Sequence, residues 1–174
     1  MSETRIQREE APPDLLPRPP RHRVERRSVT WWTLRALIGS GLLLGLLAFL
    51  TSQLEPARPW LEPVMVVVAA LSVLHIAIMP TCRYRIHRWE TTDEAVYALS
   101  GWLVREWRVA PISRIQTVDT KRGPLQQLLG LATVTVTTGS AHGPVQLAGL
   151  DRETATRVAR RLTEITQHTP GDAT

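Results

Sequence analysis

The chain has 174 residues, enough for one ordinary domain or for a smaller domain with a membrane anchor. Its net charge is +5, and arginine supplies nearly all of the positive charge because Lys121 is the only lysine. The single cysteine, Cys82, excludes an internal disulfide, and the clustering of arginines around two apolar runs argues against nucleic acid as a partner.

Residues 1–28 are predicted to be a disordered, basic and proline-rich tail. The segment contains five prolines and too few large apolar side chains to offset the entropy lost on ordering. Its basic part, residues 18–27, is interpreted as a topology signal, and contact with anionic lipid is compatible with the same charges.

Residues 29–80 are predicted to form a transmembrane helical hairpin. The apolar runs 31–52 and 60–79 are each long enough to cross a hydrocarbon core about 30 Å thick. Only a few residues separate them, so the two helices are expected to turn back on each other. Pro80 is expected to end the second helix, because proline cannot continue the backbone hydrogen bonds.

The flanks of the hairpin indicate its orientation. Trp31 and Trp32 start the first run, where indole rings favour the headgroup region. Arginines concentrate before the first run and after the second, whereas the loop between them has only Arg58. The positive-inside rule therefore predicts a multi-pass protein of the cytoplasmic membrane with both termini in the cytoplasm. Cys82, at the boundary, is either a small apolar residue or a palmitoylation site.

Three residues inside the predicted spans are candidates for a special role. Gly41 and Gly45 have the spacing that lets two helices approach closely, either within the hairpin or in a homo-oligomer. His75 is ionisable and so a functional candidate. The only carboxylate in either span, Glu62, lies at the outer end of the second span, far from His75, so a neutral histidine facing the first helix is preferred.

Residues 81–168 are predicted to be a mainly β domain followed by one helix, and residues 169–174 a tail. Period-two alternation and turn residues place the strands. The expected strands are 83–89, 95–100, 102–109, 114–120, 133–137 and 145–148. Asp151 is a suitable N-cap for a last amphipathic helix that covers an open face of the sheet.

A series of short motifs in this domain resembles a known family. The matching residues are Tyr84-Arg85-Ile86, Pro111 to Val118, Gly123-Pro124-Leu125, Leu129 to Ala132 and Val134 to Gly139. Together with the two preceding helices, they resemble the bacterial pleckstrin-homology-like membrane proteins, the YdbS-like family with a bPH2 domain. The resemblance implies a bent antiparallel sheet, or open barrel, of seven strands capped by a C-terminal helix. The residue pattern shows about six strands, so a further break is expected at 125–129 or near Trp102.

Some motif positions are expected to be structural, and others form a candidate contact surface. The structural set is Pro111, Ile115, Gly123, Pro124 and Gly130. The candidate partner or lipid contacts are Arg114, Gln116, Lys121 and Arg122. Strand alternation alone also explains Arg114 and Gln116, so a structural role for them is the preferred alternative.

No catalytic constellation appears, so no enzyme activity, cofactor or metal is expected. The preferred function is a membrane-anchored scaffold at the inner face of the cytoplasmic membrane that binds a protein partner. The resemblance suggests a related membrane protein with several pleckstrin-homology-like copies as that partner. The alternatives are an accessory subunit of a transport, export or resistance system, and an anionic-lipid-binding domain.

Overall fold

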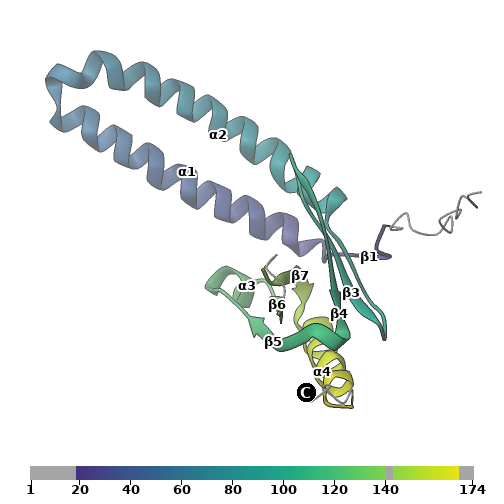
Figure 1. Cartoon of the computed structure of the whole chain (residues 1–174). Helices are drawn as coiled ribbons and strands as arrows, with labels where there is room; N and C mark the ends of the chain where they lie inside the picture. The colour runs from purple at the N-terminus through teal and green to yellow at the C-terminus, as the bar shows by residue number, and fades with distance from the viewer. Residues whose placement is uncertain (1–18, 140–142, 169–174) are drawn as a thin grey trace, which may run out of the picture.

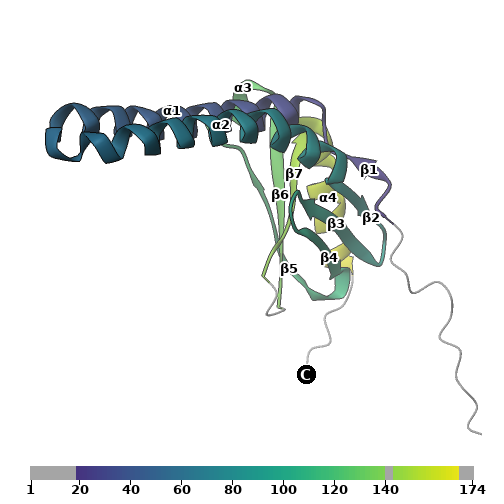
Figure 2. The ribbon, with the colours of Figure 1, turned by 90° about the horizontal axis from the view of Figure 1, so that it is seen from above.

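Two long helices project from a mainly β domain (Figure 1), in a computed structural model that describes residues 19–139 and 143–168. Helices α1 (Arg27–Gln53) and α2 (Arg58–Ile86) form an antiparallel hairpin and are joined by a single 3₁₀ turn, Glu55–Ala57. Seen from above, they run side by side away from the domain (Figure 2). Residues 1–18 of the predicted N-terminal tail, and the predicted tail 169–174, lie outside the described residues.

Both helices are longer than a bilayer requires. They contain 27 and 29 residues, whereas about 20 helical residues cross the hydrocarbon core. Along most of their length they expose large apolar side chains such as Leu42 and Val73, which are 72% and 70% exposed. Such surfaces are stable against lipid and not against water. The excess length belongs to the domain end, where Trp32 and Met79 are buried.

Two sequence predictions about the second helix are wrong. Pro80 does not end α2, which continues to Ile86, so the family motif at residues 84–86 is helical. Proline removes one helical hydrogen bond, but that loss is tolerated where neighbouring groups pack around it. Here Pro80 is buried, and the His87 N–H still closes the last turn on the Arg83 carbonyl at 2.9 Å. The predicted strand 83–89 begins only at residue 88.

The described strands form two antiparallel sheets. The order is β1-β2-β3-β4 in the first sheet and β5-β6-β7 in the second. Their bounds are β1 His22–Arg23, β2 Arg88–Thr91, β3 Ala95–Gly101, β4 Arg105–Pro111, β5 Ile115–Lys121, β6 Leu131–Thr138 and β7 Val145–Asp151. The connectors are η2 (Ile112–Arg114) and a short helix α3 (Pro124–Leu128), and the chain continues into α4 (Arg152–His168). This arrangement confirms the predicted helical hairpin followed by a bent antiparallel sheet and a C-terminal helix.

The seventh strand comes from an unexpected place. Strand β1 precedes α1 and pairs with β2, with His22 opposite Trp89. Neither the Trp102 region nor 125–129 hides a strand. The prediction of a disordered tail is therefore wrong for residues 19–28, because Val24 is buried and the Glu25 N–H donates to the Gly149 carbonyl at 2.9 Å.

One apolar core joins the hairpin to the domain. It lies between the two sheets and α4, with fully buried Val96, Val134 and Leu162 at its centre. Trp32 from α1 and Met79 from α2 belong to the same cluster. Asp151 does cap α4 as predicted, because its carboxylate accepts a hydrogen bond from the Glu153 N–H at 3.0 Å.

Candidate functional site

A groove runs beside one edge of the first sheet. Strand β4 pairs with β3 along one side, and its other side pairs with no strand that the structure describes. The space there measures about 500 Å³, and we call it the β4 groove. It is lined by Glu106, Trp107, Arg108, Val109, Pro111, Arg114, Thr138, Gly143 and Val145. These residues bring β4 and η2 together with the adjoining ends of β6 and β7.

Strand alternation decides which side chains of β4 reach this groove. Ala110 is fully buried, so Trp107 and Val109 face the outside of the sheet. Val109 is 46% exposed, and the Trp107 indole N–H is buried without a hydrogen-bond partner. The floor of the groove is therefore apolar.

The charged side chains of the groove differ in whether they have a partner within the protein. Arg108 pairs with Glu106 at 3.2 Å and donates to the Pro144 carbonyl at 3.1 Å, so it connects β4 to the start of β7. Arg114, at the far end, forms no ion pair with any residue that the structure describes. A carboxylate in the groove could therefore bind the Arg114 guanidinium.

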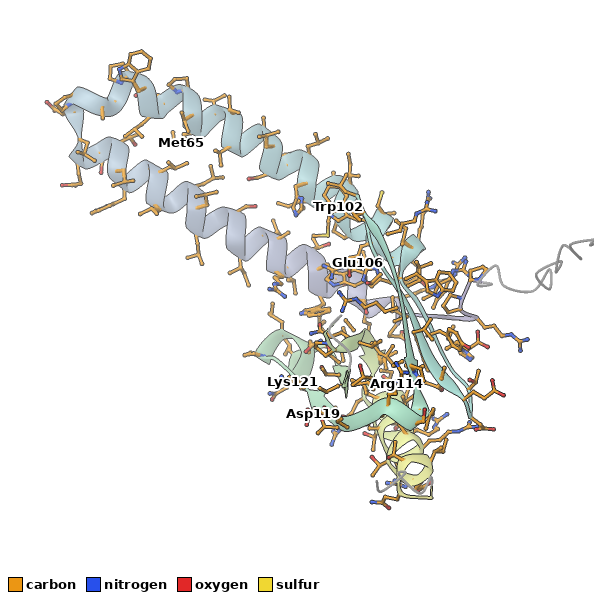
Figure 3. The ribbon with its side chains drawn as sticks, viewed as in Figure 1. Met65, Trp102, Glu106, Arg114, Asp119 and Lys121 are labelled. Atoms are coloured by element: carbon orange, nitrogen blue, oxygen red, sulfur yellow. The ribbon has the colours of Figure 1, made fainter. Side chains whose placement is uncertain are left out.

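The four predicted contact residues do not form one patch. Arg114 and Lys121 stand at opposite ends of β5 (Figure 3), which extends about 20 Å at the usual rise per residue. Arg122 donates to the Leu131 carbonyl at 3.2 Å. Gln116 occupies a β-bulge and packs close to Gly139. Among the four, Arg114 alone lines the β4 groove.

The motif residues that were expected to be structural make local contacts. The Gly123 N–H donates to the Gln126 side chain at 3.0 Å, just before Pro124 starts α3. Gly130 has φ +68°, a conformation that glycine adopts without strain, and its carbonyl accepts a bond from the Arg152 N–H at 3.0 Å. Ile115 packs against the core. Pro111 lies at the end of β4 and also lines the groove.

A second polar cluster lies where the hairpin enters the domain. Trp32 is only 1% exposed, so its predicted place at the lipid headgroups is wrong. The Arg83 guanidinium stacks 4.8 Å from its ring centroid, and the His87 ring lies 5.1 Å away. Burial, with nearby Arg83, lowers the pKa of His87 to about 4, so this histidine is neutral at physiological pH. Cys82, on the same stretch of α2, is half-buried and not in a disulfide.

The candidates inside the spans have few protein neighbours. A Cβ added at Gly41 or Gly45 would meet no atom within 4 Å, so packing within the hairpin does not use this pair. The His75 ring contacts Trp102 edge-on at 5.7 Å, which puts a residue of the domain beside it. Among the described residues, no group of three or more His, Cys, Asp or Glu side chains could hold a metal ion.

With this geometry in view, the comparisons with known proteins identify the family. A family model described as "Bacterial PH domain" matches residues 40–166, well over half of the chain. The chain belongs to the bacterial PH domain family. It is also 26% identical, over 156 residues, to the UPF0699 transmembrane protein YdbS of Bacillus subtilis (strain 168), covering 88% of this chain and 97% of that protein. No solved structure matches the chain. The protein is thus a membrane protein with a bacterial PH domain.

Within this bacterial PH domain, sequence reasoning missed most of the groove. It identified Pro111 and Arg114 but not Trp107, Val109 or Val145. A signal was present, because the predicted strand 102–109 places Trp107 and Val109 together on one face. Whether that face and the neighbouring edge stay open depends on contacts between distant strands, which alternation does not encode.

Proposed function

We propose that this protein is a membrane-anchored interaction module whose bacterial PH domain binds a protein partner. The hairpin holds the domain against the membrane, and the partner supplies an extended segment to the β4 groove. The observation that carries this proposal is the β4 groove itself. It has an apolar floor and a volume of about 500 Å³, and it lies beside a strand edge that pairs with no described strand.

The chemistry of the groove defines the segment that it fits. A sheet edge offers backbone donors and acceptors to an added strand, and side-chain pockets then provide specificity. Trp107, Val109 and Val145 supply apolar contact, and Arg114 supplies a cation at one end. The partner segment is therefore extended, apolar at alternate positions and acidic where it meets Arg114.

The distribution of arginines supports a cytoplasmic location for this groove. Arginines flank the domain ends of both helices, whereas the opposite end of the hairpin has only Arg58, the first residue of α2. The protein is then a multi-pass protein of the cytoplasmic membrane with both termini inside. A partner on that face, such as a related membrane protein with several PH-like domains, has direct access to β4.

A site-specific photo-crosslink tests the proposal. A benzophenone amino acid at Val109, in full-length protein in native membranes, should yield a protein adduct, whereas the same probe at exposed Arg157 on α4 should not. Arg114→Glu should remove at least four-fifths of the Val109 adduct. The matched charge reversal Arg157→Glu should leave it unchanged.

The identity of the adduct decides between partner classes. A different membrane protein as the adduct supports a scaffold, and an adduct of twice the chain mass indicates a second copy of this protein in the groove. The proposal fails if Val109 gives no protein adduct, or if Arg114→Glu and Arg157→Glu affect the adduct equally.

The two alternative functions have less support. Anionic-lipid binding by the predicted basic set needs those side chains on one face, and Arg114 and Lys121 are separated by the length of β5. A transport path through the hairpin needs His75 to face a pathway, whereas its ring contacts Trp102 of the domain.

A further inference from the structure

The tip of the β3–β4 hairpin, residues 102–104, is apolar. Leu103 and Val104 are 78% and 73% exposed, and they directly follow Trp102 in the chain. Turns between strands normally carry polar residues or glycine, because water surrounds them. Three consecutive apolar residues at a turn therefore indicate surroundings other than water.

Contacts with α2 give the level of this tip relative to the membrane. The β3–β4 hairpin runs alongside α2, and Trp102 lies against this helix (Figures 1 and 3). The Trp102 ring is 5.7 Å from that of His75. His75 is exposed and belongs to the apolar part of α2, where its neighbours Val73 and Leu74 are also exposed.

The position of His75 along α2 gives the depth of the β3–β4 tip in the bilayer. Trp60, 79% exposed, stands near the outer start of the helix, and about 20 residues from there span the hydrocarbon core and end near Met79. Met79 is also where the domain begins to bury the helix. His75 precedes Met79 by four residues, which is about 6 Å of helix rise. The level of the tip is therefore inside the domain-side face of the hydrocarbon core.

We infer that the β3–β4 tip inserts into the leaflet on the domain side, next to α2. Leu103 and Val104 contact acyl chains, and the Trp102 indole lies between them and His75. Arg105 follows at the base of the tip and forms no ion pair with any described residue, so its guanidinium is placed to meet lipid phosphates. The membrane then holds the domain at a third point besides α1 and α2.

Glycine makes the tip narrow enough for this role. Gly101 has φ +112°, and a Cβ at this position would lie 1.8 Å from the Val104 carbonyl oxygen. No other residue type fits so close an approach. The tight turn projects Leu103 and Val104 outward from the end of the two-stranded ribbon.

This inference depends on the membrane span and not on the β4 groove, so the two can fail separately. The test uses the full chain with Cys82→Ser, which removes the only cysteine. Leu103→Cys carries an environment-sensitive NBD probe in vesicles of phosphatidylcholine and phosphatidylglycerol. The matched control is Glu94→Cys, at the opposite end of β3, and Val104→Cys provides a second probe position.

The expected result is a blue-shifted NBD emission at Leu103 and Val104. Lipids with a nitroxide near the headgroup end of the acyl chain should quench these probes at least twofold more than the probe at Glu94, and aqueous iodide should show the reverse order. Quenching should not change when the protein-to-lipid ratio falls tenfold, because lipid and not a second copy covers the tip.

Two outcomes would overturn the inference. One is iodide quenching at Leu103 and Val104 equal to that at Glu94, which would put the tip in water. The other is lipid quenching that disappears as the protein is diluted, which would mean that another copy of the chain covers the tip.

Discussion

At the scale of single residues, the junction between hairpin and domain shows how close contacts limit the sequence. The Ser28 hydroxyl donates to the Gly149 carbonyl at 2.9 Å, and both residues lie within the buried junction. Gly149 has φ +78°, and a Cβ there would lie 2.3 Å from the Ser28 hydroxyl oxygen. A side chain at residue 149 would therefore meet backbone strain and a steric clash together.

Gly149→Ala is expected to lower the free energy of unfolding by about 1–3 kcal/mol, since both penalties act in the folded state alone. Thermal unfolding in detergent measures this effect. Gly41→Ala is the control, because a Cβ there meets nothing, and it should leave the unfolding temperature unchanged or slightly raised. In a double-mutant cycle, Ser28→Ala should recover part of the loss, and strict additivity would contradict the clash.

His87 makes the junction sensitive to pH. Its pKa is lowered to about 4 from an ordinary 6.5, so the unfolded chain binds the proton first as the pH falls. The contribution of neutral His87 to the free energy of unfolding is therefore fully present above pH 6.5. It declines between about pH 6.5 and 4, by at most about 3 kcal/mol. Unfolding curves across this range should show the decline. His87→Gln should flatten the pH dependence, and a slope equal to that of the unchanged protein would refute this role.

At the scale of elements, the domain is completed by segments that precede it in the chain. Strand β1 extends the first sheet, and Val24, Trp32 and Met79 fill the shared core. The Arg27 guanidinium joins this end to the second sheet through an ion pair with Asp151 at 2.8 Å and a bond to the Leu129 carbonyl. The domain boundary at residue 81, predicted from composition, cuts through this core.

A fragment of residues 81–174 is therefore expected not to fold cooperatively. It lacks β1 and three large buried side chains, and each such loss costs about 2–5 kcal/mol against a total stability of about 5–15 kcal/mol. Near-ultraviolet circular dichroism and thermal unfolding should show no fixed tertiary structure in the fragment, whereas the full chain in detergent unfolds in one transition. A sharp transition in the fragment would show that the domain folds alone.

At the scale of the whole molecule, hairpin and domain form one packed unit. Trp32 and Arg83 stack across the hairpin, and the core continues from there between the two sheets. The domain therefore has a set orientation relative to the helices, and this orientation directs the β3–β4 tip along α2. A membrane protein built in this way presents the β4 groove at a constant height above the bilayer.

The orientation of the unit in the membrane is open to protease mapping. With both termini in the cytoplasm, trypsin outside spheroplasts should leave a C-terminal epitope on the intact chain, because the exposed arginines of the domain are shielded by the membrane. In inverted vesicles the same treatment should remove the epitope within minutes. Detergent-permeabilised spheroplasts are the positive control. Loss of the epitope in intact spheroplasts would show that the domain lies outside, contrary to the predicted orientation.

Patterns within short segments were sufficient to predict much of the architecture. The two spans follow from runs of apolar residues, the strands from alternation, and the α4 cap from Asp151. Each of these features depends on neighbours in sequence and on the preference of side chains for lipid or water. The motif residues likewise indicated a PH-like fold before any long-range contact was considered.

Tertiary structure alone decided where these elements end and which surfaces remain open. Composition suggested a disordered tail for residues 19–28, yet Val24 finds a buried place there, and Pro80 is tolerated in α2 because the domain packs around it. The open side of β4 and the depth of the Trp102 tip depend on residues distant in the chain. The physical reason is that propensity is local, whereas burial and strand pairing are set by which distant surfaces meet.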